Sequence, residues 1–458
     1  MNREKTNYNN KKTNKMKKNP FMLASLMLAA VALTGCDSDD VLAIVPEEPP
    51  VEEPTEQQPP EEPTEEPKVA HIVALTDAQK TAVQKNNEFA FNFFRAISQS
   101  PNLKGKSFMV SPLSLTYALG MANAGATGQT SEEITRLLGF GADDKEAVNA
   151  LCKQLIEEMP KVDEKVTLSV ADFLAANKSV TLMEQYRQTL ADWYDAEVAS
   201  LDFASPSSVE YVNNWCREHT GGLIPKMADQ LDGPMVLLNA VYFKAPWHSK
   251  FDPAETRDET FTREDGSTVT MAMMYRDDAT IFYPGDTDPF TVLTLTYGEG
   301  HNWLLHLVLP NKKMTVDETI EELTAGKWAG KIFLDDMADI KMDIDVLLPR
   351  FKVECDIDLR DVLKGMGATS MFEPRNEFPL ISENYKDLCL DRIRQRTVFE
   401  LTEEGSEATA ATKVGWASAN GPGGGYDPFV FHATRPFIYL IQERTTGAIF
   451  FMGIYRGE

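Results

Sequence analysis

Histidines, the residues from which many catalytic and metal sites are built, are not spaced for such a site in this chain. None of the six stands in an HExxH motif. His301 and His306 are five residues apart in a strand-like stretch, where they would face opposite sides and make poor joint ligands. The remaining histidines are His71, His219, His248 and His432. We therefore expect no metal site.

The motifs of nucleophilic and phosphate-handling enzymes are missing as well. No GxSxG nucleophile elbow occurs in the sequence. The run GPGGG at residues 421–425 lacks the Lys-Ser/Thr of a phosphate-binding loop, and Pro422 removes one backbone donor. The sequence therefore predicts no catalytic residue and no cofactor. A hydrolase with scattered active-site residues is an alternative with no motif behind it.

Four cysteines follow the N-terminal region, and they form neither a CxxC pair nor a zinc spacing. Well-separated cysteines in a large domain are more often buried as small apolar residues than paired. Export from the cell would permit disulfides. The sequence leaves the disulfide state of these residues open: Cys152, Cys216, Cys355 and Cys389.

One long polar stretch near the C-terminus stands out, EEGSEATAATKVGWASANGPGGG from Glu403. It separates two strand-like runs and far exceeds a hairpin loop, so it is either disordered or functional. Its first half alternates: if Ser406 faces a core, both charges, Glu407 and Lys413, face outward. A slip of one residue would bury both charges. The uncharged inward set is Ser406, Ala408, Ala410, Thr412, Val414, Trp416 and Ser418.

The first 35 residues predict a targeting signal. Residues 1–20 carry seven Lys or Arg, and the apolar run at 21–33 has 13 residues, which is too short to span a membrane and typical of a signal peptide. It ends in Leu33-Thr34-Gly35-Cys36, which resembles the lipobox of bacterial lipoproteins. That resemblance implies a lipid on Cys36 and a membrane anchor.

Residues 36–70 predict a disordered stalk. Between Asp37 and Lys68 the chain has 12 acidic residues, one lysine and recurrent proline, a composition that repels itself and favours extended conformations. The acids directly after Cys36 resemble the surface-export signals of some Gram-negative lipoproteins. We expect an exported lipoprotein at the outer membrane or cell surface of a Gram-negative-type bacterium. The net charge of −25 argues against nucleic acid as a partner.

Residues 71–458 predict a single α+β domain. Helical spacing marks residues 76–98, with Thr76 as N-cap, and a helix is expected to start at Thr130 or Ser131. The later part has runs rich in Val, Ile, Phe and Tyr, many without alternation, which predicts strands buried on both faces. These runs are residues 235–247, 290–297, 303–310, 343–354, 396–404, 428–443 and 447–456.

Five blocks in the same order resemble the serpin family across 71–458. FELTEEGSEATAATK resembles the hinge of inhibitory serpins, in which Glu-x-Gly-Thr/Ser-Glu-Ala-x-Ala-x-Thr precedes the reactive loop. The other blocks are FMVSPLSLTYALGMANAGATGQT, VNNWCREHTGGLIPKM, LLNAVYFKAPWHSKFDPAETRDETF and FVFHATRPFIYLIQERTTGAIFFMG. The resemblance implies helices packed on three β-sheets with an exposed reactive loop.

The resemblance also implies roles by position. The hinge would be Glu403, Gly405, Ser406, Glu407, Ala408, Thr409, Ala410, Ala411 and Thr412. Trp247 falls on the family's breach at the top of the central sheet, and Ser111, Ser114, Asn239 and Gln395 fall on its shutter. Two positions depart from the family: Gln395 stands where a histidine is usual, and Thr434 stands at an Asn/Asp-type position. Glutamine also donates and accepts, so a hydrogen bond to Asn239 is still expected.

The implied activity is inhibition of serine proteases, and also of cysteine proteases, by a monomeric suicide substrate. Fourteen residues counted from Gly405 end at Ala419 and span about 46 Å as a strand. The expected reactive bond is therefore Ala419-Asn420, which suits an elastase-like protease, with Trp416 and Ala417 as alternative sites because the loop is long. The other hypothesis is a non-inhibitory binding or carrier protein on the same scaffold, against which the small residues Ser406, Ala408 and Ala410 argue.

Overall fold

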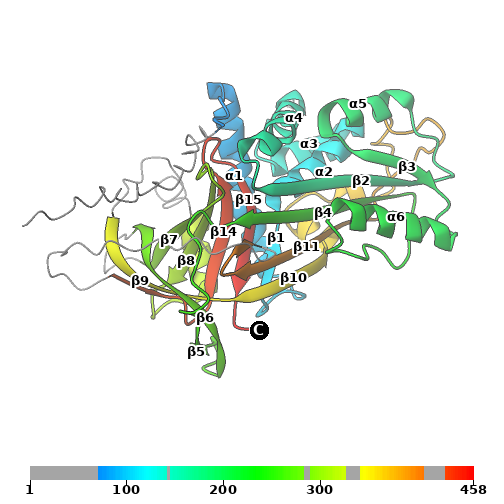
Figure 1. Ribbon diagram of the computed structural model, residues 1–458. Coiled ribbons are helices and arrows are strands. Elements are labelled where there is room, and N and C mark those ends of the chain that lie inside the picture. The colour runs from blue at the N-terminus through cyan, green and yellow to red at the C-terminus, as the bar shows by residue number, and fades with distance from the viewer. Residues whose placement is uncertain (1–70, 142–144, 283–288, 326–340, 407–428) are drawn as a thin grey trace, which may run out of the picture. The chain divides into compact units, whose positions relative to one another are not determined.

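The computed structural model describes residues 71–458 except 142–144, 283–288, 326–340 and 407–428 (Figure 1). The expected signal peptide, Cys36 and the stalk lie outside this part of the chain. Within the described part, no helix combines the length and apolar character that a membrane span requires.

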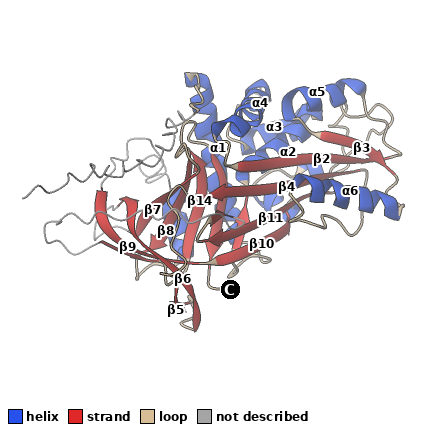
Figure 2. Ribbon diagram, viewed as in Figure 1, coloured by secondary structure: helices blue, strands red, loops and turns tan. Residues whose placement is uncertain are grey.

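Most helices lie in the first half of the chain, as the sequence predicts. Figure 2 shows helices packed beside the strands. α1 begins after a capping box in which Thr76 and Gln79 bond each other's backbone N–H, which confirms the expected N-cap. The start predicted at Thr130 or Ser131 is wrong, because α3 begins at Gly128 and both residues lie buried inside it. The helices are α1 Asp77–Ser98, α2 Pro112–Gly125, α3 Gly128–Leu137, α4 Lys145–Val162, α5 Glu184–Tyr194, α6 Pro206–His219, α7 Val316–Thr324 and α9 Arg360–Gly365. A short 3-10 helix covers Ser370–Phe372.

A six-stranded sheet positions the candidate site. Its order is β10-β11-β12-β4-β2-β3. Helices α2 and α4 pack against one face, and α6 packs against the other (Figure 1). The strands are β10 Phe351–Asp358, β11 Arg392–Thr402, β12 Gly405–Ser406, β4 Met235–Pro246, β2 Thr167–Asn177 and β3 Glu197–Leu201.

The other strands form a nine-stranded hydrogen-bonded network, in which β6 joins two sheets. The end of β6 pairs with β7, whereas its earlier residues pair with β5 and β9. With the six-stranded sheet this gives the expected three sheets, an α+β fold. The strands are β1 Phe108–Val110, β5 Arg257–Thr262, β6 Thr268–Phe282, β7 Phe290–Tyr297, β8 Trp303–Pro310, β9 Lys341–Pro349, β13 Phe429–His432, β14 Phe437–Glu443 and β15 Ile449–Tyr455.

Two predicted strands each divide into two. The run 343–354 becomes β9 and β10, and the run 428–443 becomes β13 and β14. The break in each run lies beside a proline, Pro349 or Pro436, which cannot donate to a ladder. By contrast, β14 and β15 are buried on both faces, as their lack of alternation predicts.

The four cysteines are free thiols. Cys152, Cys216 and Cys355 are buried, and burial raises the pKa of Cys216 and of Cys355 to about 12. Cys389 is half-buried. The three buried cysteines serve as small apolar residues of the interior.

Candidate functional site

The candidate site is a fork between two parallel strands of the six-stranded sheet. β11 and β4 pair in parallel from Arg392 opposite Val236 to Thr397 opposite Val241. Beyond that point β12 enters between them, antiparallel to both, so that Ser406 lies opposite Leu401 on one side and Ala245 on the other. We call this region, residues 398–406 with 242–247, the fork.

Gly405 enters the fork where no side chain fits. Its φ is +142°, and a Cβ atom there would overlap the carbonyl oxygen of Ala245 and the Cα of Pro246. Glycine is therefore required by close approach as well as by backbone conformation.

Ser406, which the alternation sets inward, is fully buried. Its hydroxyl shares a hydrogen bond of 2.7 Å with the hydroxyl of Tyr297 on β7. Desolvation of Tyr297 by burial raises the pKa of this phenol, so both hydroxyls stay neutral and the pair joins the fork to the second sheet.

Trp247 holds the turn between β11 and β12. Its indole N–H donates to the carbonyl oxygen of Thr402 at 2.8 Å, and its backbone N–H donates to that of Glu404 at 2.9 Å. Its ring stacks on Tyr297, with centroids 4.2 Å apart. Phe251 adds a backbone N–H to the carbonyl oxygen of Glu403. Trp247 and Phe251, from the segment that follows β4, thus fix the turn by three hydrogen bonds.

The first hinge acid, Glu403, is also fixed by its side chain. It is 7% exposed, and its carboxylate accepts from the hydroxyl of Thr256 at 2.8 Å. Arg350 lies 3.7 Å from the same oxygen. The neighbouring Glu404 pairs with Lys250. Both acids therefore have partners at the base of the loop.

A row of buried polar side chains crosses three strands below the fork. Asp172 on β2, Asn239 on β4 and Gln395 on β11 lie opposite one another in register. The amide nitrogen of Asn239 donates to Asp172 at 2.8 Å, and that of Gln395 donates to the Asn239 oxygen at 3.1 Å. The hydrogen bond expected from Gln395 to Asn239 is therefore present.

Gln395 also binds the start of α2. Its amide accepts from the backbone N–H of Ser111 and donates to the carbonyl oxygen of Ser111, each at 2.9 Å. The Ser111 hydroxyl donates to the carbonyl oxygen of Phe450 and caps α2 by accepting from the N–H of Ser114. The row, from Asp172 through Asn239 and Gln395 to Ser111, bonds the seam between β4 and β11 to the helical layer.

Sequence reasoning missed Asp172 and Tyr297. Burial raises the pKa of Asp172 to about 7, although the Asn239 hydrogen bond lowers it. The only signal was an acid inside the apolar run LSVADFLAAN, which does not by itself distinguish a buried acid from an exposed one. Tyr297 gave no signal, because its partners come from distant segments.

The remaining predicted site residues lie outside the described residues: hinge residues Glu407, Ala408, Thr409, Ala410, Ala411 and Thr412, and the reactive-bond candidates Trp416, Ala417, Ala419 and Asn420. In the part of the chain that the structure describes, no group of three or more His, Cys, Asp or Glu side chains could hold a metal ion. The fork offers strand edges and a closed turn, and its geometry suits the addition of a strand.

Comparison with known proteins assigns the chain to a family. The profile described as "Serpin (serine protease inhibitor)" matches residues 84–456. Neuroserpin from Gallus gallus is 30% identical over 379 residues, which cover 79% of this chain and 88% of that protein.

Solved structures agree. Serpin48 from the insect Tenebrio molitor superposes with a TM-score of 0.72 at 25% identity, covering 84% of this chain and all of that one. Human thyroxine-binding globulin, solved with its hormone, superposes with a TM-score of 0.71 at 24% identity, covering 83% of this chain and all of that one. The latter likeness concerns the fold alone.

Proposed function

The chain belongs to the serpin family, and from this premise we propose that it inhibits serine proteases as a suicide substrate. The protease would cleave a bond within the loop that follows Ser406. The cleaved loop would add to the six-stranded sheet as a strand, and the acyl-enzyme would be trapped. Cysteine proteases are a second target class. The observation that carries the proposal is β12, which already occupies the fork between β4 and β11.

The register of β12 supports the proposal. Continued downward, it would bring Ala408 between Phe399 and Phe243 on the inner face, where only a small residue fits without opening the sheet further. It would bring Thr412 between Gln395 and Asn239, whose mutual hydrogen bond must then be exchanged for bonds to the new strand.

The same register would turn the loop charges outward. On the outer side, Glu407 would lie between Lys244 on β4 and Glu400 on β11. Lys413 would lie on the same side, between Leu238 on β4 and Arg394 on β11. The alternation therefore keeps both charges off the inner face of the sheet. On the outer face, Glu407 would have Lys244 as a cationic partner, whereas Lys413 would enter the buried cluster that Leu238 forms with α6.

We place the reactive bond at Ala419-Asn420, with Trp416 and Ala417 as alternatives. Fourteen residues span the length needed to carry a protease along the sheet, about 46 Å. Alanine before the cut suits a protease with a small specificity pocket, such as an elastase-like enzyme. We further propose that the protein is monomeric and exported, and that a lipid on Cys36 and the stalk 36–70 hold it at the cell surface, where it shields the cell from proteases.

The test uses residues 65–458, which form a compact unit. This protein is incubated with elastase, chymotrypsin, trypsin and subtilisin and run on denaturing gels. A band near the summed mass that survives boiling supports the trap, and mass spectrometry of the released peptide names the cleaved bond. Cleavage by every protease without such a band would overturn the proposal.

A non-inhibitory binding or carrier protein on the same scaffold is the alternative, against which the small residues Ser406, Ala408 and Ala410 argue. Ala408→Arg separates the two. The large charged residue must pass between Phe399 and Phe243, so an inhibitor should become a substrate and lose at least about tenfold in trapped complex per cleavage. Lys413→Arg, at an outward position, is the matched control and should change little. A carrier would form no trapped complex in any of the three proteins.

A further inference from the structure

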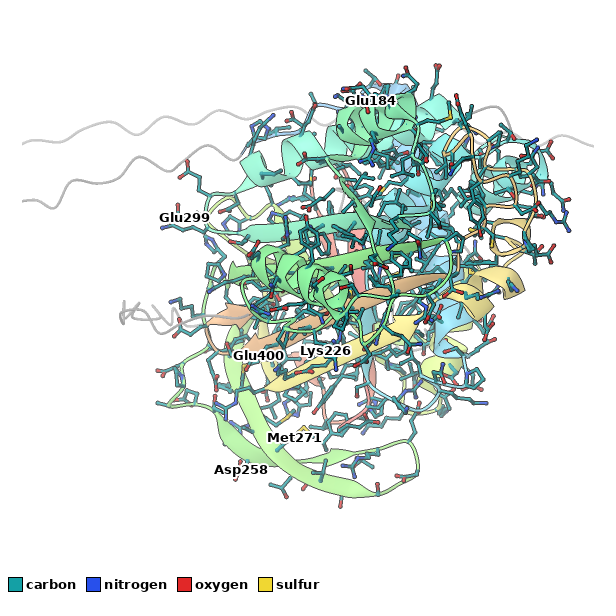
Figure 3. The ribbon with its side chains drawn as sticks, turned by 90° about the vertical axis from the view of Figure 1, so that its right-hand side faces the viewer. Glu184, Lys226, Asp258, Met271, Glu299 and Glu400 are labelled. Atoms are coloured by element: carbon teal, nitrogen blue, oxygen red, sulfur yellow. The ribbon has the colours of Figure 1, made fainter. Side chains whose placement is uncertain are left out.

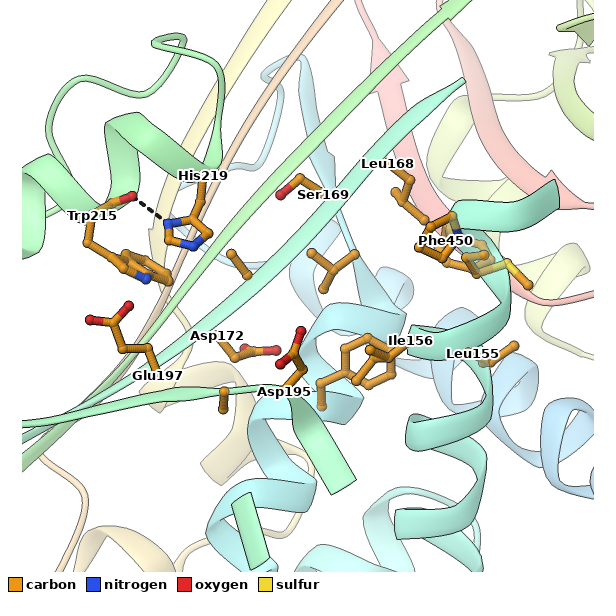
Figure 4. A pocket seen from close by; sticks show the side chains of 16 residues that line it. Leu155, Ile156, Leu168, Ser169, Asp172, Asp195, Glu197, Trp215, His219 and Phe450 are labelled. Carbon is orange, nitrogen blue, oxygen red and sulfur yellow. Dashed lines mark hydrogen bonds between the residues drawn. The ribbon is translucent and has the colours of Figure 1, made fainter. Parts of the chain in front are cut away.

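A pocket opens at the free edge of β2, away from the fork (Figure 4). β3 pairs with β2 only from Phe173 onward, so residues 167–172 have no strand partner on that edge within the described chain. The resulting cavity has a volume of about 490 Å³, which is within the range of small-molecule sites. α2 and α4 close it on one side of the sheet, and α6 closes it on the other.

The walls of the pocket combine apolar surface with negative charge. Leu155, Met159 and Val170 supply apolar side chains. Three carboxylic acids also line it, and the lining contains no lysine or arginine. They are Asp172, Asp195 and Glu197.

A second, independent feature is a buried donor with nothing to bind. Trp215 is 4% exposed, and its indole N–H has no hydrogen-bond partner among the described residues. Its ring lines the same pocket beside Glu197 (Figure 4). A buried donor without a hydrogen-bond partner destabilises the folded protein, so an occupant with an acceptor there would be favoured.

We propose that this pocket binds a small organic amine that carries an apolar ring and a hydroxyl or carbonyl oxygen. The ammonium group pairs with Asp172 and Asp195, and the ring lies on the apolar wall. The oxygen accepts from the indole N–H of Trp215. An anionic ligand is disfavoured by the three carboxyl groups, and a neutral ligand leaves them without a counter-charge.

The site is coupled to the fork through the polar row. Asp172 accepts from Asn239, and Asn239 accepts from Gln395 across the seam that a new strand would open. An ammonium ion beside Asp172 keeps its carboxylate charged, which strengthens the Asn239 hydrogen bond. A ligand that prefers this closed arrangement slows insertion. This regulatory role rests on the proposed protease inhibition, whereas binding of the amine does not.

Binding is tested by calorimetry on residues 65–458 with three matched probes: tyramine, phenethylamine without the hydroxyl, and 4-ethylphenol without the amine. Tyramine should bind saturably, and 4-ethylphenol should bind at least about tenfold more weakly, the equivalent of 1.4 kcal/mol. Asp172→Asn and Asp195→Asn should each weaken the binding of tyramine by about tenfold. Trp215→Phe keeps the ring and should weaken tyramine by about threefold while leaving phenethylamine unchanged.

Asp258→Asn is the control, because this acid lies on β5, which contributes no residue to the pocket. Figure 3 shows Asp258 at the opposite end of the view from Glu184 on α5. It should bind tyramine as the unaltered protein does. No saturable binding of either amine up to about 5 mM, or equal binding of 4-ethylphenol, overturns the inference. Unchanged binding of tyramine in both Asp172→Asn and Asp195→Asn also overturns it.

The protease assay distinguishes the two proposals. Saturating tyramine should lower the trapped fraction with the unaltered protein and leave it unchanged with Asp172→Asn. Amine binding without any trapped complex would overturn the inhibitor proposal and leave this site standing. A trapped complex without amine binding would overturn the amine site and leave the inhibitor proposal standing.

Discussion

At the residue scale, His306 is a histidine that the fold keeps neutral. It is buried, and its ring nitrogens bond the Thr294 hydroxyl at 2.8 Å and the Gln442 side chain at 3.0 Å. Burial lowers its pKa to about 4, although the Gln442 hydrogen bond raises it. The unfolded chain therefore binds the proton more tightly, and the stability present above about pH 6.5 is lost as pH falls toward 4.

We predict that His306→Gln removes most of this pH dependence. The linkage amounts to about 3 kcal/mol between pH 7 and pH 4. Urea unfolding of both proteins at pH 4.5 and 7.5 measures the difference. His219→Gln, at a half-buried histidine, is the control. The assignment would be contradicted if the free energy of unfolding changed equally between the two pH values in His306→Gln and in the unaltered protein.

Asp172 gives the opposite dependence of stability on pH. Its pKa is raised by burial to about 7, so the folded chain binds the proton more tightly than the unfolded chain. The stability this gives is complete below about pH 4 and is lost as pH rises through 7. The free energy of unfolding of Asp172→Asn should therefore exceed that of the unaltered protein by about 1–3 kcal/mol at pH 8 and should be about equal to it at pH 4. A stability gain that is the same at both pH values would show that charge is not the cause.

At the element scale, the fork depends on Gly405. Gly405→Ala should destabilise the protein by about 2 kcal/mol more than Gly222→Ala, since Gly222 also has a positive φ but a Cβ atom added there would meet no other atom within 4 Å. Chemical denaturation measures the stability, and hydrogen exchange of the amides of residues 402–406 locates the effect. Equal losses in both variants would mean that close approach to β4 is unimportant.

The sequence predicts elements better than their contacts. The capping box at Thr76 is local, and so it could be found from the chain alone. The start of α3 was misplaced because Ser131 has the residue type of a cap but lies buried inside the helix, with its hydroxyl bonded to Asn123. The Asp172–Asn239–Gln395 row joins strands 67 and 156 residues apart. No local pattern reports such a register.

At the scale of the whole molecule, cleavage followed by strand addition should stabilise the fold. A new central strand would pair with both β4 and β11 along their length and fill the gap that now begins at residue 398. We predict a rise in Tm of at least about 10 °C after cleavage, given about 2–4 °C per kcal/mol for a large domain. Circular dichroism melts before and after limited proteolysis measure it. Ala408→Arg, which should not insert, is the control, and an equal rise in that variant would contradict the prediction.

The two residues of β12 have a kinetic consequence. The first residue pair of a new strand forms slowly, because loop entropy is lost before any hydrogen bond compensates for it. In this protein the first pairs, those of β12 with β4 and β11, exist before cleavage. Trp247 and the hydrogen bond between the Tyr297 and Ser406 hydroxyls hold them in place. Strand addition would therefore start at propagation and need no nucleation event. Its speed would depend on how quickly β4 separates from β11, one residue pair at a time, down to the hydrogen bond between the side-chain amides of Gln395 and Asn239.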